Sequence, residues 1–465
     1  MILLAHSNFI LQDAKQLEKM KPYSPLSTLL AAALLRSKGH EVALFDATFA
    51  SGISEFDAML DELVPDVVVV MEDNFNFLTK MCTTVRRQSA LEMIGAAHGR
   101  GCKVAANGPD VSDNPALYFS AGADAVVLGE GETGVLELIA HWTGVGGEID
   151  SIEGLIIPEE GGLKRTHPRR ALQDLDGLPH PAWDLLDVEA YRSAWTTAHA
   201  EFSWNMATSR GCPYACNWCA KPTFGRRYTA RSPADVACEM RRLKTGIAPD
   251  SLWFTDDILG LDVDWICDFA DEVRRQDAVI PFTMQSRVNL MTEKAVAALA
   301  AAGAREVWLG VESGSQKILD AMDKGTTVEA ARAATRTLKE HGIKACWFIQ
   351  LGYPGESWED LLSTRDLIRD EEPDDIGVSV AYPLPGTEFH EHIRAQLGRQ
   401  RNWRDTGDLA MLFQGTYNTA LYRRVRDVLH REAETRQPDL QAWSAIEQDA
   451  HLHRSPRPFR PAVSA

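Results

Sequence analysis

The stretch "PDVVVVME", residues 65–72, decides the fold class of the first part of the chain. Its four consecutive valines lack the polar–apolar alternation of a half-exposed strand. They predict a strand buried on both faces, which is the usual setting of a parallel sheet with helices on both sides. Further strand signals, separated by helical segments, occur at 1–7, 41–47, 103–109 and 123–132. We therefore predict an α/β fold that begins with a doubly wound, Rossmann-like parallel-sheet domain over residues 1–145.

Loops at the carboxyl ends of these strands are the candidate binding loops of the first domain. Ligands of doubly wound sheets bind at that edge, so a ligand is expected there. The loops in question are 24–27, 72–76, 107–114 and 129–132.

The rest of the chain contains a second alternating series. Residues 146–199 are rich in Pro and Gly and are predicted to be a linker. Strand signals then occur at 203–209, 251–257, 281–287, 306–313, 344–352 and 376–384. Six strand–helix units predict a partial (β/α)6 barrel over 200–394, with its functional residues at the carboxyl ends of the strands. Residues 395–465 predict a short helical C-terminal region with a mobile tail.

Charge and hydropathy exclude several classes of protein. The net charge of −18 argues against a nucleic-acid partner, because phosphate binding needs clustered positive charge. Two basic runs, 164–170 and 225–231, are interpreted as solvated faces, with a small anionic substrate group as the alternative. No apolar run is long enough to span a bilayer, and residues 1–8 resemble a buried strand more than a signal peptide. We expect a cytoplasmic protein, in which clustered cysteines bind metal or do chemistry.

Three of the eight cysteines lie together in "RGCPYACNWC", residues 210–219. Cys212, Cys216 and Cys219 have no fourth ligand nearby, whereas structural zinc and four-iron clusters normally take four protein ligands. The pattern therefore predicts a thiolate-bound metal centre with one open position, for substrate or cofactor. A zinc knuckle with a distant fourth ligand and unligated buried cysteines are the alternatives. The other five cysteines, predicted to be core residues, are Cys82, Cys102, Cys238, Cys267 and Cys346.

The octapeptide "CPYACNWC" resembles the Cys-x3-Cys-x-aromatic-Cys signature of the radical S-adenosylmethionine (radical SAM) enzymes. The resemblance extends over about residues 200–390. It implies that the three cysteines hold a 4Fe–4S cluster whose open iron is chelated by the amino and carboxylate groups of SAM. One electron then splits SAM into methionine and a 5′-deoxyadenosyl radical.

Later motifs of the same family occur in order at the strand ends. The resemblance implies that they surround SAM. Asp256 and Asp257 would hold the methionine ammonium, unless one of them is a helix N-cap. Arg287 would pair with the SAM carboxylate, unless it forms a structural salt bridge. The other implied SAM-binding residues are Gln285, Gly310, Glu312, Ser313 and Pro354.

The first domain resembles the cobalamin-binding domain that precedes many such enzymes. The matching segments are 23–47, 107–115 and 126–132, and the residues implied to bind cobalamin are Pro25, Leu26, Asn107, Gly108, Gly129, Glu130, Gly131 and Glu132. The Asp-x-His-x-x-Gly motif is absent after the first strand. His98 and Gly101 have the right spacing, but Ala96 replaces the aspartate and the stretch reads as a helix end. The lower axial ligand is left open, and the alternative is a domain that only shapes the substrate pocket.

Together, these resemblances imply a cobalamin-dependent radical SAM enzyme that methylates an unactivated carbon of a small molecule. Cobalamin would take a methyl group from one SAM and pass it to a substrate radical made with a second. The alternative is radical cyclisation, rearrangement or oxygenation without methyl transfer. A non-catalytic sensor and an RNA methylthiotransferase fit the motifs and the acidic charge less well. An electron donor such as flavodoxin or ferredoxin is the implied partner.

Overall fold

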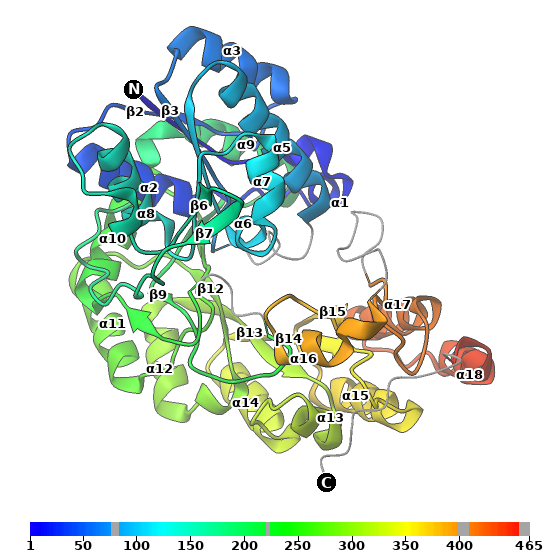
Figure 1. Cartoon of the computed structure of the whole chain (residues 1–465). Coiled ribbons are helices and arrows are strands. Elements are labelled where there is room, and N and C mark those ends of the chain that lie inside the picture. Colours follow the sequence, from blue (N-terminus) through cyan, green and yellow to red (C-terminus); the bar gives the residue numbers. More distant parts are fainter. Residues whose placement is uncertain (76–82, 220–223, 398–408, 455–465) are drawn as a thin grey trace.

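The computed structural model describes residues 1–75, 83–219, 224–397 and 409–454. It contains two large sheets, each with helices packed against it, and a helical region at the C-terminal end (Figure 1). The predicted mobile tail falls almost entirely outside the described residues.

The N-terminal sheet has seven strands in the order β2-β1-β3-β4-β5-β6-β7. Their bounds are β1 Ile2–Ala5, β2 Val42–Phe45, β3 Val67–Met71, β4 Lys103–Asn107, β5 Ala125–Val127, β6 Leu155–Glu159 and β7 Gly162–Arg165. β1 to β5 are parallel, as predicted. The order changes direction between β1 and β3, and such a switch point is where doubly wound sheets open a crevice for ligands.

The four-valine strand β3 is buried on both faces, as its sequence predicts. Val67, Val69 and Met71 pack with helices α2 (Leu26–Ser37) and α8 (Gly131–Trp142). Val68 and Val70 pack on the other face with α3 (Ile53–Leu63) and α5 (Thr83–Gly99). Figure 1 shows the two helix layers on opposite sides of the sheet.

Residues predicted to be a linker contain regular structure. β6 and β7 form an antiparallel hairpin that extends the parallel sheet at β5. Gly161, with φ +86°, turns the hairpin. Helix α9 (Val188–His199) follows, and its Tyr191 and Trp195 pack in the core of the second sheet. The short strands escaped detection because only three consecutive apolar residues, 155–157, mark β6. The domain boundaries at 145, 199 and 394 stay a prediction.

The second sheet has six parallel strands in the order β15-β14-β13-β12-β11-β8, which is the predicted partial barrel. The strands are β8 Ser203–Met206, β11 Ser251–Phe254, β12 Phe282–Ser286, β13 Ala304–Glu312, β14 Lys344–Leu351 and β15 Asp375–Val380. The helices between them are α10 Pro233–Gly246, α11 Val263–Arg275, α12 Glu293–Ala302, α13 Gln316–Ala321, α14 Val328–Glu340 and α15 Trp358–Glu371.

Local sequence fixes where the long outer helices of the barrel begin. Each has a Ser, Thr or Asp N-cap whose side chain accepts a backbone N–H of the first turn. These caps are Ser232, Asp262, Thr292, Thr327 and Ser357. The loops that precede the caps therefore start at the carboxyl ends of the strands, where the predicted site residues lie.

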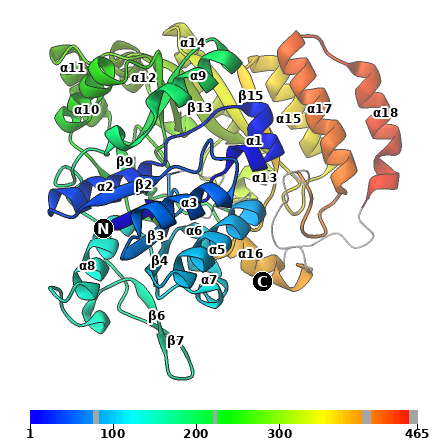
Figure 2. The same ribbon diagram turned by 90° about the horizontal axis from the view of Figure 1, so that it is seen from above.

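The C-terminal region is helical, as predicted. Within residues 395–465 it contains α17 (Thr419–Thr435) and α18 (Leu440–Ala450), and α16 (Glu388–Ile393) precedes it. Leu421, Tyr422 and Val425 of α17 join the apolar core of the barrel. Seen from above, α17 and α18 lie at the β15 side of the molecule, away from α8 (Figure 2). Within the described residues, the structure has no helix long and apolar enough to cross a membrane.

Candidate active site at the three-cysteine loop

The cysteine loop follows the short strand β9 (Ser209–Arg210) through a turn that only glycine allows. This strand pairs antiparallel with β10 (Thr229–Ala230) and leads into Gly211. Gly211 has φ +79°, and a Cβ there would lie 1.8 Å from the carbonyl oxygen of Arg227. Cys212 N also donates to Gly225 O at 3.3 Å. The backbone thus folds back on itself at the start of the loop.

None of the three cysteines of the loop forms a disulfide within the part of the chain that the structure describes. Cys216 is buried, and Cys212 and Cys219 are partly exposed. Among the described residues, no three His, Cys, Asp or Glu side chains are close enough together to bind a single metal ion. A four-iron cluster has a different requirement, because each cysteine binds its own iron.

Asn217, inside the cysteine motif, fastens the loop to three other segments. Its side-chain amide donates to Ala321 O at 2.9 Å and to Asp323 Oδ2 at 3.0 Å. Its Oδ1 accepts from Tyr353 OH at 2.8 Å, and its backbone carbonyl accepts from Phe389 N at 3.0 Å. Sequence analysis missed this residue, because its partners are remote in the chain.

Arg287 lies directly against the loop. Its Nη1 is 3.3 Å from Cys216 Sγ, and its guanidinium carbon stands 3.8 Å from the centre of the Tyr214 ring. Its Nη2 donates to the carbonyl oxygen of Lys324. The side chain is buried, so its charge needs a partner. The sequence predicted a contact with the SAM carboxylate, whereas here the guanidinium contacts a cysteine sulfur.

A second buried cation, Lys324, completes this side of the site. Its Nζ is 2.7 Å from Glu312 Oε1, and both side chains are buried. The ammonium also lies 5.7 Å from the centre of the Trp218 ring. A Cβ on Gly310 would come within 2.7 Å of Lys324 Nζ and 2.8 Å of Glu312 Oε1. Gly310 therefore leaves room for the ion pair. Lys324 carries no signal in the sequence beyond its place after α13.

The remaining predicted SAM residues lie at the carboxyl ends of β11 to β14. Asp256 is buried and accepts hydrogen bonds from Thr208 N at 3.1 Å, Thr208 Oγ1 at 2.7 Å and the Ser209 hydroxyl. Burial raises its pKa. Gln285 Nε2 donates to Asp256 O at 2.6 Å. Asp256 therefore binds the backbone that leads into the cysteine loop, and partly buried Asp257 follows it.

Ser313 and Pro354 lie on neighbouring loops and are both buried. Ser313 Oγ is 3.2 Å from Thr364 Oγ1 of α15. Next to Pro354, Glu356 is fully enclosed and accepts from Gly352 N at 2.6 Å. Burial raises the pKa of Glu356 to about 8. This part of the barrel end thus contains an acid without a cationic partner among the described residues, unlike Glu312.

The two halves of the molecule meet through a buried ion cluster. Arg210, the residue before Gly211, donates to Glu132 Oε1 at 2.8 Å and to Glu130 Oε1 at 3.2 Å. Glu130 also accepts from Leu172 N at 2.6 Å. Burial lowers the pKa of Arg210, but the two carboxylates offset this effect and leave it raised. Glu130 and Glu132, predicted to bind cobalamin, are therefore engaged with the strand that carries the cysteine loop.

The predicted loops of the N-terminal domain come together at one sheet edge. Ser27, next to Pro25 and Leu26 at the start of α2, donates to Asp73 Oδ1 at 3.0 Å and accepts from Asn74 N at 2.9 Å. Asn74 Nδ2 donates to Asn107 Oδ1 at 3.1 Å. Asn107 Nδ2 in turn donates to Val127 O and Gly129 O at 2.8 and 3.2 Å. A continuous series of hydrogen bonds therefore connects all four loops.

Glycines let these loops approach one another closely. A Cβ on Gly108, where φ is +143°, would lie 2.5 Å from Glu72 Cβ, and one on Gly131 would lie 2.5 Å from Met71 Cε.

His98 packs against Gly122 at the far end of α5, away from this edge, as the interpretation of a helix end implied. His6, beside the edge, uses Nε2 toward Asp46 at 2.9 Å and Nδ1 toward Asn8 N at 3.2 Å.

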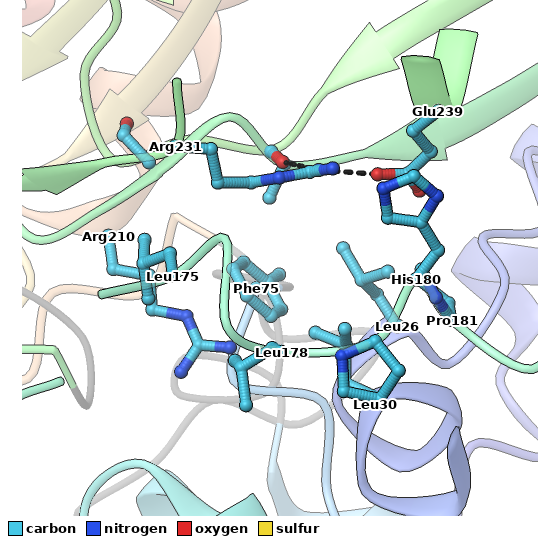
Figure 3. Close-up of a pocket in the computed structure, with 13 residues that line it drawn as sticks. Leu26, Leu30, Phe75, Leu175, Leu178, His180, Pro181, Arg210, Arg231 and Glu239 are labelled. Carbon is cyan, nitrogen blue, oxygen red and sulfur yellow. Dashed lines mark hydrogen bonds and ion pairs between the residues drawn. The ribbon is translucent and has the colours of Figure 1, made fainter. Parts of the chain in front are cut away.

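A small cavity of about 30 Å³ lies between the two halves, next to the strand that leads into the cysteine loop (Figure 3). Leu26, Leu30 and Phe75 line it from the N-terminal side, and Arg210 and Arg231 line it from the barrel side. Arg231 is already paired with Glu239 and Asp235. The cavity is mainly apolar, and its charged members have partners.

The prediction that the five isolated cysteines are core residues was only partly right. Cys102 and Cys346 are buried, as predicted. The prediction was wrong for Cys238 on α10, which is exposed, and for Cys267 on α11, which is partly exposed. Both sit on helices that have one solvent-facing side. Cys82 lies outside the described residues.

With this geometry established, known proteins provide a comparison. A family model described as "Radical SAM superfamily" matches residues 206–368, which include the cysteine loop and strands β11 to β14. Residues 206–368 therefore form a radical SAM domain. An uncharacterized methyltransferase of Pyrococcus horikoshii is 28% identical over 385 residues, which cover 82% of this chain and 81% of the relative.

Solved structures extend the likeness beyond the radical SAM core. The radical SAM methyltransferase TsrM from Kitasatospora setae, solved with cobalamin and a 4Fe–4S cluster, has a TM-score of 0.70 and 23% identity, over 86% of this chain and 78% of that chain. The cobalamin-dependent radical SAM enzyme OxsB has a TM-score of 0.76 and 16% identity, over 97% and 75%. At these identities the likeness shows the fold, and it covers the N-terminal sheet as well as the barrel.

Proposed function

We propose that this radical SAM protein is a cobalamin-dependent enzyme that methylates an unactivated carbon of a small-molecule biosynthetic intermediate. The observation that carries the proposal is the placement of the cysteine loop. The loop opens at the carboxyl end of the barrel, next to the edge where the binding loops of a Rossmann-like domain converge. Relatives and structural neighbours described as methyltransferases support it.

The loop fits a 4Fe–4S cluster held by Cys212, Cys216 and Cys219. Three thiolates suit iron, and the buried Arg287 guanidinium at Cys216 Sγ offsets negative charge that such a centre carries. When bound, the cluster supplies one electron to SAM and so gives a 5′-deoxyadenosyl radical. Gly211 and Asn217 hold the loop open for this centre, through the turn and the hydrogen bonds described above.

SAM is proposed to lie across the carboxyl ends of β11 to β14. Glu312, held by Lys324, and Ser313 are proposed to bind its ribose or ammonium, with Asp257 and Gln285 on one side and Pro354 near the adenine. Gly310 keeps the ion pair in place. Asp256 and Arg287 have other partners, so we propose that they position the loop and its sulfur instead of contacting SAM.

Cobalamin is proposed to lie at the sheet edge formed by loops 24–27, 72–74, 107–108 and 129–131. Asn107, Gly108, Gly129 and Gly131 offer a close-packed surface for a planar ring, and cobalamin supplies a methyl carrier when bound. Glu130 and Glu132 are proposed to align the two halves through Arg210. His98 is remote and both ring nitrogens of His6 are engaged, so neither is proposed as an axial ligand.

An electron donor of the flavodoxin or ferredoxin class and a cytoplasmic location complete the proposal. Cysteines that lie together in one loop without forming disulfides suit a reducing compartment. The proposal is tested by anaerobic reconstitution with iron, sulfide and cobalamin, followed by turnover with methyl-labelled SAM. We expect 5′-deoxyadenosine and a product that carries the label. Formation of 5′-deoxyadenosine with an unlabelled product would contradict methyl transfer and favour cyclisation or rearrangement.

A further inference from the structure

The first basic run of this acidic chain lies beside Phe224, which directly precedes the second run close to the start of the cysteine loop. A hollow of about 340 Å³ is lined by Arg165, Arg169 and Arg170 from the first run. Its opposite wall is Phe224, which directly precedes the second run. The runs lie far apart in the sequence, and the fold brings the first one against Phe224, next to the second.

Four arginines of this surface are exposed and carry uncompensated charge. Lys164 is paired with Asp150 at 2.7 Å, and Arg169 is paired with Glu137. By contrast, Arg165, Arg170, Arg226 and Arg227 are exposed and have no ion pair within the described parts of the chain. A cluster of unpaired cations is unexpected on a protein whose net charge is −18.

This surface is physically continuous with the cysteine loop. Cys212 N donates to Gly225 O, and Gly211 packs against Arg227 O. The backbone that carries Arg226 and Arg227 is thus the direct support of the loop. Pro213 and Ala215 of the loop are exposed, and Cys212 and Cys219 are partly exposed. The surface therefore borders the side of the loop that faces solvent.

We propose that Arg165, Arg170, Arg226 and Arg227 form the docking surface for an acidic one-electron donor protein of the flavodoxin or ferredoxin class. This inference rests on the proposed function. An acidic donor is repelled by the net charge of the chain and attracted by these four arginines, which directs it to the cysteine loop. One electron leaves the reduced donor and reduces the cluster, the donor is oxidised by one electron, and no group is transferred.

The experiment compares two sources of electrons. Variants R165E/R170E and R226E/R227E are assayed anaerobically for 5′-deoxyadenosine formed from SAM, with increasing reduced flavodoxin or with dithionite. With flavodoxin we expect KM to rise by about tenfold or more and the salt dependence of the wild type to be lost, because rim charges control association. With dithionite we expect rates within about twofold of wild type. Arg336→Glu on α14, also exposed and unpaired within the described residues, is the matched control and is expected to change neither assay.

The outcomes separate the two proposals. Wild-type protein that forms no 5′-deoxyadenosine with dithionite would contradict the proposed function itself. Wild-type protein active with both reductants, combined with charge-reversed variants that keep the flavodoxin KM, would overturn the docking surface alone. Loss of the dithionite rate with normal iron content would also overturn it, because the arginines would then belong to the site. Iron content and melting temperature verify folding, and R165Q/R170Q is expected to give a smaller KM effect than R165E/R170E.

Discussion

The cysteine loop and the edge of the N-terminal sheet are adjacent regions built from different interactions. Buried cations surround the loop. Arg287 contacts Cys216, Lys324 pairs with Glu312, and Arg210 pairs with two glutamates. The sheet edge is held mainly by amide, hydroxyl and backbone groups, in the series from Ser27 to Asn107. The contrast matches the proposed ligands, because a thiolate-bound cluster is anionic, whereas a corrin ring is large and planar and needs a close-packed surface.

The largest effect is expected from a substitution that removes the proposed metal centre itself. Cys216→Ala takes away a proposed iron ligand, so bound iron and 5′-deoxyadenosine formation are expected to fall to background. The matched control is Cys238→Ala, at an exposed thiol on α10, which is expected to keep both. Equal iron content and turnover in the two variants would mean that the loop is not the metal centre.

Arg210→Met tests the ion cluster that joins the two regions. It leaves Glu130 and Glu132 buried without their cation, so the free energy of unfolding is expected to fall by roughly 3–5 kcal/mol. Urea denaturation measures the change. Arg275→Met, which breaks an exposed pair with Glu272 on α11, is expected to produce no measurable change. Similar midpoints for both variants would show that the cluster contributes little to stability.

Glu356 is a buried acid at the barrel end that, unlike Glu312, has no cationic partner among the described residues. Its effect on the pH dependence of the unfolding free energy can be measured. Its pKa rises from 4.5 to about 8, so the folded state holds a proton that the unfolded state releases above pH 4.5. The unfolding free energy should therefore fall between pH 4.5 and 8, by up to about 1.4 kcal/mol per pH unit. Glu356→Gln should flatten this slope in urea titrations across that range. An unchanged slope would assign the pH dependence to other groups.

Arg287→Gln tests the contact between one buried cation of the cysteine loop and Cys216 Sγ. Removing a cation from Cys216 Sγ should lower the reduction potential of the reconstituted cluster, because charge and hydrogen bonds at the sulfurs raise it. Spectroelectrochemical titration without SAM measures this directly, with Arg336→Gln as the control. If the potential is unchanged and only the SAM affinity falls, Arg287 binds the SAM carboxylate, as the sequence first predicted.

The smallest effect is expected at the edge of the N-terminal sheet, which is held mainly by uncharged groups. Asn107→Ala breaks the hydrogen-bond series between the β3, β4 and β5 loops, and should lower cobalamin affinity by roughly tenfold, equivalent to about 1.4 kcal/mol. Absorbance titration with cobalamin measures the affinity. Iron content should stay at the wild-type level, since Asn107 does not touch the cysteine loop. A simultaneous loss of iron would mean that the two regions are not independent.

Local patterns in the sequence predicted the sheets and the cysteine loop. The valines of β3 and the N-caps of the barrel helices act on their neighbours, so their consequences can be read from a short window. The β6–β7 hairpin was missed because its apolar run is only three residues long. The pairs between Arg210 and Glu132 and between Lys324 and Glu312 were also missed. They depend on how loops meet in space, which no spacing motif encodes. Asp256 and Arg287 were found by motif, but the structure gives both of them partners other than SAM.

The most direct test of the central claim is electron paramagnetic resonance of the anaerobically reconstituted, reduced protein with and without SAM. The account predicts the signal of one reduced 4Fe–4S cluster that changes when SAM is added, because SAM binds the iron that the three cysteines leave open. A spectrum that SAM leaves unchanged, from a cluster already saturated by side chains of the protein, would contradict it.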